Sequence, residues 1–111
     1  MQVTRQDLDG VVILRLAGRL IGEEEPGNVT HDAFREVIDE GHRQILLDLS
    51  EVPFVNSTGL GVLVVNYVRL RREQGDLKIL NPSGRLRALF RTLPKLFEIY
   101  YDEGEALASF S

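Results

Sequence analysis

The stretch VPFVNSTGLGVLVV, residues 52–65, carries most of the information in this sequence. Three polar residues, Asn56, Ser57 and Thr58, interrupt an apolar run that resumes after them. Side chains of these types are preferred as helix N-caps, because their oxygens accept hydrogen bonds from the first free backbone N–H groups. The stretch therefore predicts a sharp corner that leads into a helix. The open question is whether the corner only caps that helix or is also a functional site.

The segments on either side of the corner, residues 50–59, predict a buried strand and a long helix. Residues 45–49, ILLDL, are typical of a central strand that is covered on both faces. Residues 60–70 are apolar on nearly every side except at Asn66, which predicts a helix that is largely covered by protein at its start. Gly75 is expected to end this helix.

Strands and helices alternate along the chain. Asp9-Gly10 lies between two β-rich runs and predicts a hairpin turn. The further predicted elements are a helix from about Asn28 or Thr30 to Gly41, a strand at 76–80, a helix at 83–93 with Ser83 as its N-cap, a strand at 97–101 and a helix at 103–110. The order β-β-α-β-α-β-α-β-α predicts an α/β fold: a single domain, residues 1–111, with a mixed, mainly parallel sheet of about five strands and four helices.

The composition excludes several classes of protein. The chain has 111 residues, a length typical of one domain, and no cysteine, so neither a disulfide nor a thiolate metal site holds it together. His31 and His42 belong to no metal-binding motif. The net charge of −4 argues against nucleic acid as a partner, because such binding neutralises phosphates. Because no signal peptide and no run of roughly 20 apolar residues is recognisable, we expect a cytoplasmic protein without membrane insertion.

Three loops are expected to share one edge of the sheet. In a parallel sheet, functional loops gather beyond the carboxyl ends of the strands, and residues 18–28, 52–59 and 81–83 each follow a strand directly. The corner can be explained as a simple cap, with Gly59 and Gly61 present for close packing. A catalytic serine is not supported, because the flanks do not form a Gly-x-Ser-x-Gly elbow. The GLG triplet is only a fragment of a dinucleotide-binding loop, which leaves small-molecule binding as a weak alternative.

The longer segment LLDLSEVPFVNSTGLGVLV, residues 46–64, resembles the signature of the STAS domain, most closely that of the bacterial anti-sigma factor antagonists. The segments at 13–20 and 81–110 also resemble the corresponding parts of that family. The resemblance implies partner switching: the unphosphorylated antagonist binds an anti-sigma factor, which is also a serine kinase, and so releases a sigma factor. Phosphorylation ends this binding, and a metal-dependent serine phosphatase restores it.

Carried over onto this motif, the phosphoacceptor is Ser57, with Thr58 as the second choice. The resemblance implies a protein that is a ligand and a substrate of its partners, with no catalytic residue, metal site or cofactor of its own. We expect it to be a monomer, because no apolar stripe is predicted to remain exposed. The expected partner-binding residues are Asn56, Ser57, Thr58, Gly59, Leu60, Glu23, Glu24, Glu25, Asn81, Ser83 and Arg85.

One departure from the family pattern keeps a second hypothesis open. Asn56 occupies a position where these antagonists usually have an aspartate. The acidic run Glu23–Glu25 either supplies the missing negative charge or is an ordinary solvated loop. The alternative function is a STAS scaffold that is not phosphorylated, or a subunit of a signalling or lipid-transport complex.

Overall fold

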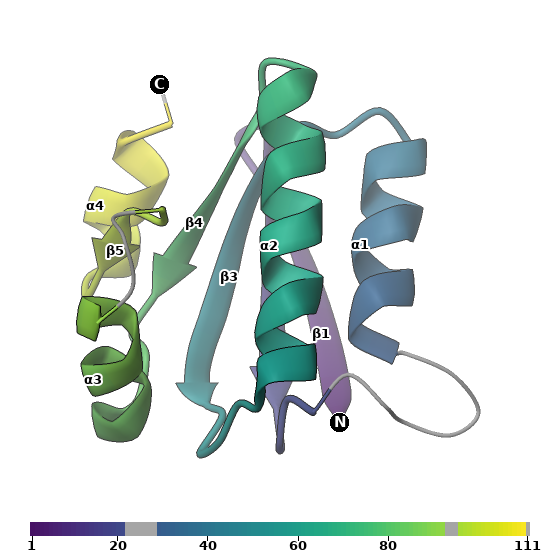
Figure 1. Cartoon of the computed structure of the whole chain (residues 1–111). Coiled ribbons are helices and arrows are strands. Elements are labelled where there is room, and N and C mark those ends of the chain that lie inside the picture. The colour runs from purple at the N-terminus through teal and green to yellow at the C-terminus, as the bar shows by residue number, and fades with distance from the viewer. Residues whose placement is uncertain (22–28, 93–95, 111) are drawn as a thin grey trace.

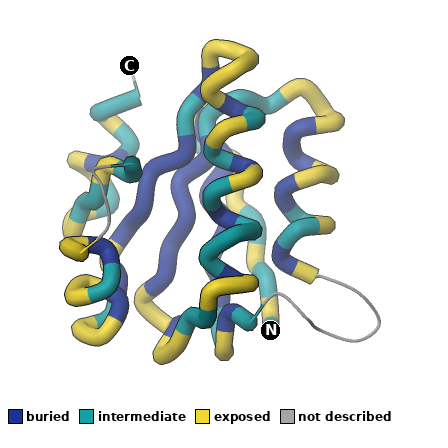
Figure 2. The backbone as a smooth tube through the Cα atoms, in the orientation of Figure 1, coloured by how far each residue is buried: buried dark blue, intermediate teal, exposed yellow. Residues whose placement is uncertain are grey.

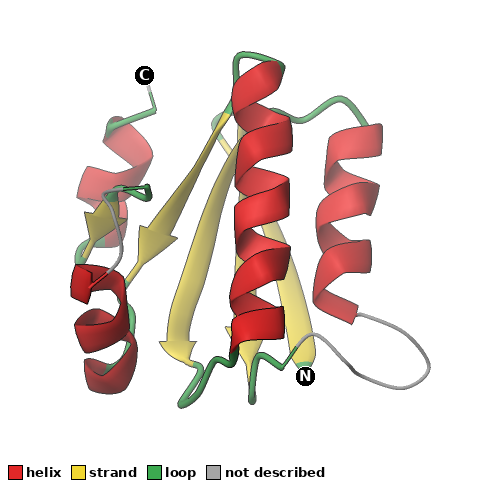
Figure 3. Cartoon of the chain, in the orientation of Figure 1, coloured by secondary structure: helices red, strands yellow, loops and turns green. Residues whose placement is uncertain are grey.

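The computed structural model describes residues 1–21, 29–92 and 96–110. The strands form one sheet in the order β1-β2-β3-β4-β5, in which β1 is antiparallel to β2 and all other neighbours are parallel (Figures 1 and 3). The predicted fold class and element order are confirmed. In chain order the elements are β1 (Gln2–Leu8), β2 (Val11–Ala17), α1 (Val29–Asp39), β3 (Gln44–Glu51), α2 (Ser57–Arg72), β4 (Asp76–Leu80), α3 (Gly84–Thr92), β5 (Ile99–Tyr100) and α4 (Glu103–Ala108).

The sheet divides the core into two parts. Because side chains alternate along a strand, Leu14 and Leu47 face the layer of α1, α2 and α3, whereas Ile13 and Leu46 face α4. The central strands are buried along nearly their whole length, as Figure 2 shows in dark blue, and this confirms the prediction that β3 is covered on both faces. The helix layer holds the largest buried side chain, that of Phe34 in α1.

The end of α2 differs from the expectation. Gln74 takes the left-handed conformation there, with φ 65°, and its N–H donates to the Arg71 carbonyl at 3.2 Å. The Gly75 N–H donates to the Leu70 carbonyl at 2.7 Å, which completes a Schellman-type ending. Gly75 is needed for a different reason: a Cβ at this position would overlap the backbone carbonyl of Arg43. The glycine therefore makes room for the segment that leads into β3.

The prediction that α2 is largely covered at its start holds only in part, because Gly59 and Leu63 are buried whereas Ser57, Thr58 and Val65 are exposed. Its buried stripe consists of Gly59, Leu63, Asn66 and Leu70, while Val65 on the opposite side is 58% exposed. The expected polar exception, Asn66, points inward, where its amide donates to the Val62 carbonyl at 2.8 Å and lies 3.2 Å from the His31 ring. Apolar surface is therefore left on α2, and this removes the argument from which a monomer was expected.

The last elements are shorter than predicted. The edge strand β5 has only two residues, because Phe97 leaves the sheet and packs edge-on against Tyr67 and Phe90, with ring centroids 5.1 and 5.9 Å away. In α4 the first turn is capped by Asp102, whose carboxylate accepts from the Glu105 N–H at 2.9 Å. No helix among the described residues has both the length and the apolar character that a membrane span requires.

An ion-pair cluster joins β1 to the end of α1. The Arg5 guanidinium donates to the carboxylates of Asp7 and Glu40, each at 2.8 Å. This hydrogen bonding by Arg5 holds the pKa of both carboxyls below their ordinary values of 3.8 and 4.5. The folded state therefore binds fewer protons at these carboxyls than the unfolded chain does at acidic pH.

Acid is expected to destabilise the protein partly through this cluster. The contribution is complete above the unfolded pKa values and is lost as the pH falls through the lower folded ones. An Arg5→Gln variant should therefore lose less of its stability than the wild type between about pH 5 and pH 3. Urea unfolding across this range measures the effect. Arg35→Gln is the control, because its contact with Asp32 is exposed and local. Equal acid sensitivity in wild type and Arg5→Gln would contradict the prediction.

Candidate partner-binding site

The corner is capped by Asn56. This residue is in extended conformation, with φ −100° and ψ 178°, and its side-chain oxygen accepts a hydrogen bond from the Gly59 N–H at 2.8 Å. Its backbone carbonyl accepts the N–H of Leu60 at 2.9 Å. The sequence left Asn56, Ser57 and Thr58 as possible caps. In the structure the cap is Asn56, whose side chain has no hydroxyl.

Ser57 and Thr58 do not form the cap of α2. Ser57 and Thr58 are the first two residues of α2, and both are exposed. Neither hydroxyl forms a hydrogen bond with the described part of the chain. The first turn of α2 contains no acidic side chain of its own to balance the positive end of the helix dipole. A negative group on either hydroxyl would be favoured by this local field.

The two glycines of the corner have different roles. Gly59 is buried, and a Cβ at this position would overlap the backbone carbonyl of Leu20 in the segment after β2. Gly61 faces open space, because a methyl group added at its Cα would meet no neighbour within 4 Å. The prediction of close packing is therefore confirmed for Gly59 and wrong for Gly61.

Backbone hydrogen bonds attach the segment after β2 to the corner. The Leu20 N–H donates to the Phe54 carbonyl at 2.9 Å, and the Asn56 N–H donates to the Leu20 carbonyl at 3.2 Å. Leu20 also forms an isolated parallel bridge with Val55. The N-terminus of α2 is therefore held in place by a neighbour 35 residues away in the sequence.

The loop after β4 is attached to the corner from its other side. The Ser83 hydroxyl donates to the Val52 carbonyl at 3.0 Å, so the side chain does not cap α3 as predicted. Its carbonyl accepts the N–H of Arg87 instead, at 2.9 Å. The loops after β2, β3 and β4 thus meet at one edge of the sheet, the lower edge in Figure 1, as expected from the parallel topology.

The other predicted site residues divide into three groups. Asn81 and Arg85 are exposed near this edge, Asn81 with a φ of 53° and its N–H bonded to the Tyr100 carbonyl at 2.7 Å. Leu60 is half-buried beside the corner and packs on the core. The run Glu23–Glu25 lies outside the described residues.

Sequence reasoning did not single out an aromatic residue at the corner. Phe54 is 39% exposed, and the Arg19 guanidinium lies over its ring, 5.1 Å from the centroid. The available signal was a phenylalanine next to Pro53 in the predicted corner, three residues before Ser57. An exposed aromatic ring with a cation above it is the kind of group that is enriched at protein–protein interfaces.

The titratable groups do not indicate catalysis. The described residues include no group of three or more histidine, aspartate or glutamate side chains that could hold a metal ion. The described carboxyls with shifted pKa values, those of Asp7 and Glu40, belong to the cluster around Arg5. Within the described part of the chain, the edge has two exposed hydroxyls without a hydrogen-bond partner, an exposed aromatic ring and the N-terminus of a helix.

Comparison with known proteins gives the family. The STAS domain profile matches residues 2–106. The anti-sigma F factor antagonist of Paenibacillus polymyxa is 31% identical over 114 aligned residues, which cover 96% of this chain and 92% of the relative. The chain therefore belongs to the STAS domain family, among the anti-sigma factor antagonists.

Solved structures agree with this assignment. An anti-sigma factor antagonist from Mycobacterium paratuberculosis is 26% identical, with a TM-score of 0.79 and coverage of 98% of this chain and 92% of that one. The Bacillus cell fate determinant SpoIIAA in its phosphorylated form has a TM-score of 0.76 at 21% identity, covering 99% and 100% of the two chains. Unphosphorylated SpoIIAA has a TM-score of 0.70 at 22% identity, covering 97% and 96%. At these identities the SpoIIAA structures show a common fold.

Proposed function

We propose that this chain is a phosphorylation-controlled anti-sigma factor antagonist. Its unphosphorylated form binds an anti-sigma factor that is also a serine kinase and thereby releases a sigma factor, and a phosphoryl group on Ser57 ends the binding. The observation that carries the proposal is the division of roles at the corner. Asn56 caps α2, which leaves the exposed Ser57 hydroxyl available to a kinase.

The physical chemistry of the corner supports a switch that does not require refolding. A phosphoryl group adds close to two negative charges at neutral pH, and the helix N-terminus tolerates them because its dipole and free N–H groups favour anions. At a close interface the same group adds bulk and a charge that must be desolvated, so the partner loses affinity. A ten-fold loss needs only about 1.4 kcal/mol.

The remaining parts of the cycle belong to the partners. The kinase supplies ATP, and a metal-dependent serine phosphatase removes the phosphoryl group, so the chain itself acts as a ligand and a substrate and needs no cofactor. We assign the contact surface to the solvent-accessible residues of this edge: Asn56 and Thr58 around the acceptor, with Asn81 and Arg85 beside them. Gly59 lies beneath this surface, where it is buried against Leu20.

Intact mass spectrometry tests the proposal. The chain is incubated with ATP and each purified anti-sigma factor kinase encoded in the same genome, and the modified site is mapped by fragmentation. We expect one phosphoryl group on Ser57 in the wild type and in Thr58→Ala, and none in Ser57→Ala. Modification of Thr58 alone would move the acceptor by one residue. No modification by a kinase that is active on another antagonist would refute the switch and favour a scaffold that is not phosphorylated.

A further inference from the structure

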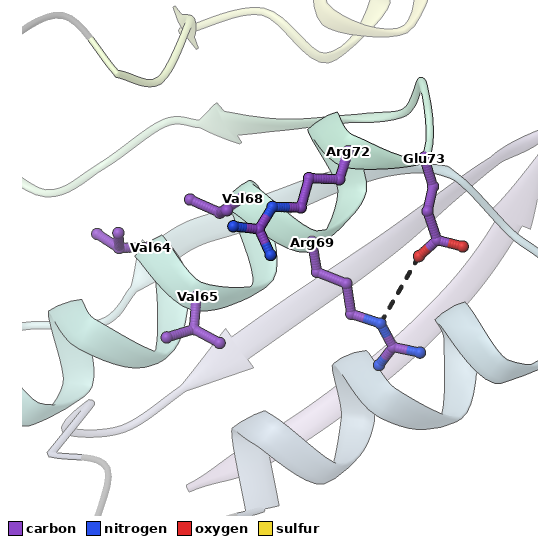
Figure 4. A pocket seen from close by; sticks show the side chains of 6 residues that line it. All are labelled: Val64, Val65, Val68, Arg69, Arg72 and Glu73. Atoms are coloured by element: carbon purple, nitrogen blue, oxygen red, sulfur yellow. Dashed lines mark ion pairs between the residues drawn. The ribbon is translucent and has the colours of Figure 1, made fainter.

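The outer side of α2 carries an apolar groove that the proposed switch does not explain. Val64, Val65 and Val68 line it, and Val65 and Val68 are 58% and 38% exposed. The groove has a volume of about 460 Å³, is open to solvent, and is bordered at the end of α2 by Arg69, Arg72 and the C-cap residue Glu73 (Figure 4). Adjacent exposed valines on one helix form an apolar patch of the kind found at interaction sites.

The groove lies on the same side of α2 as Ser57. With about 100° of rotation per residue, Val64 and Val68 fall within about 20° of Ser57 around the helix axis, whereas Arg72 and Val65 lie about 60° and 80° to one side. With a rise of about 1.5 Å per residue, the surface from Ser57 to Arg72 is roughly 22 Å long. A partner that covers the Ser57 hydroxyl can therefore extend along the valines without leaving this face.

The charges at the far end of the groove show which partner would fit. Arg69 is already paired with Asp39 at 3.1 Å and with Glu73 at 3.8 Å. Arg72 differs, because within the described residues it has no ion-pair partner, and its side chain runs back toward Val68 (Figure 4). A free guanidinium beside an apolar groove is complementary to a carboxylate next to apolar side chains.

A second copy of the chain does not satisfy this requirement. Residues 57–72, which form α2, include no aspartate or glutamate, so two copies packed through this face would bring Arg72 no carboxylate from the helix. The adjacent Glu73 is already bonded to Arg43 at 2.9 Å. Packing of α2 on α2 would therefore leave Arg72 without a carboxylate from the helix, which favours an acidic surface of a different protein.

We propose that the groove is a second contact region for the anti-sigma factor, occupied by an amphipathic helix whose apolar side covers Val65 and Val68 and whose acidic residue pairs with Arg72. This inference rests on the proposed function, because it names the same partner. It adds that part of the affinity comes from a region about 10 to 22 Å from the phosphoacceptor. This region strengthens the complex, while Ser57 decides whether it forms.

Affinity measurements on surface variants test the inference. Calorimetry with the purified anti-sigma factor kinases of the same genome should show that Val65→Glu and Val68→Glu each weaken binding by about ten-fold or more, because each would bury a carboxylate against the apolar side of the partner helix. Ala108→Glu is the matched control. It adds the same charge to an exposed helical position in α4, on the opposite face of the sheet, and should stay within about two-fold. Thermal unfolding confirms that each variant is folded.

Arg72 provides an independent test of the charge. Arg72→Glu should weaken binding by about ten-fold, whereas Arg72→Lys should retain most of the affinity. Binding of Arg72→Gln should also depend less on salt than binding of the wild type.

The outcomes separate this inference from the proposed function. Wild-type affinity in the valine and Arg72 variants, together with loss of binding in Ser57→Glu, would overturn the groove as a contact region and leave the switch intact. Absence of binding by the wild type to every anti-sigma factor would overturn both. Dimerisation in sedimentation velocity that Val65→Glu abolishes would make a second copy the occupant and would also overturn the inference.

Discussion

Gly59→Ala is expected to lower the free energy of unfolding by about 2 to 3 kcal/mol. The added methyl group would overlap the Leu20 carbonyl, and its Cβ would also lie 3.1 Å from Leu20 Cγ. The methyl group can be accommodated only if α2 moves away from the segment after β2. That movement would weaken the hydrogen bonds that join Leu20 to Phe54 and to Asn56. The cost of overpacking should therefore exceed the gain of alanine over glycine in a helix, about 1 kcal/mol.

Gly61→Ala is the matched control for this prediction. It makes the same chemical change two residues along the same helix, where the new methyl group meets nothing within 4 Å. We expect it to stabilise the protein by up to about 1 kcal/mol through helix propensity alone. Urea unfolding of both variants measures the difference. Similar stabilities of the two variants would mean that the approach of Leu20 to α2 is not a rigid feature of the fold.

Ser57→Glu is expected to weaken binding to the anti-sigma factor by about 100-fold, close to 2.7 kcal/mol. The carboxylate places a desolvation cost at the centre of the proposed contact, as the phosphoryl group would. The fold should be unaffected, because Ser57 forms no side-chain hydrogen bond with the described residues and an acidic side chain is favourable in the first turn of a helix. Calorimetry gives the affinity, and thermal unfolding gives the stability of the same samples.

Two further variants locate the effect at one side chain. Ser57→Ala should bind about as well as the wild type, because the hydroxyl itself is small and is not needed for the contact. Arg91→Glu reverses a charge at an exposed position of α3 outside the proposed site and should change the affinity little. Retention of wild-type affinity in Ser57→Glu would show that negative charge at this residue does not control the partner.

The order of strands and helices could be predicted from the sequence, because each element has a residue pattern that is typical of its type. The apolar run at 45–49 has the composition of a covered strand, and the polar corner after it is typical of a helix start. Parallel topology then places the loops after β2, β3 and β4 at one edge, as the hydrogen bonds of Leu20 with Phe54 and of Ser83 with Val52 confirm. Ser57 can therefore be placed on an exposed helix terminus from the sequence alone.

The details that sequence reasoning missed depend on neighbours that are distant in the chain. Ser83 has the composition of an N-cap, but a free carbonyl at Val52 is a better partner for its hydroxyl once the two loops meet. The inward side of α2 could not be deduced from its apolar residues, because Asn66 is buried with its amide bonded to the Val62 carbonyl of the same helix, whereas Val65 and Val68 are exposed. Likewise, Gly75 is of a type that commonly ends a helix, but here a glycine is required because a Cβ would overlap the Arg43 carbonyl.

The cap at Asn56 bears on whether such a modification can be reversed without damage to the fold. If Ser57 is the phosphoacceptor, as proposed, it is a different residue from the capping Asn56, so each cycle of modification would leave the cap of α2 in place. Under the proposed function, the same molecule can be switched off and on repeatedly without being resynthesised. The active fraction of the pool is then fixed by the relative rates of the kinase and the phosphatase, so the cell can reset the response within the lifetime of a single molecule.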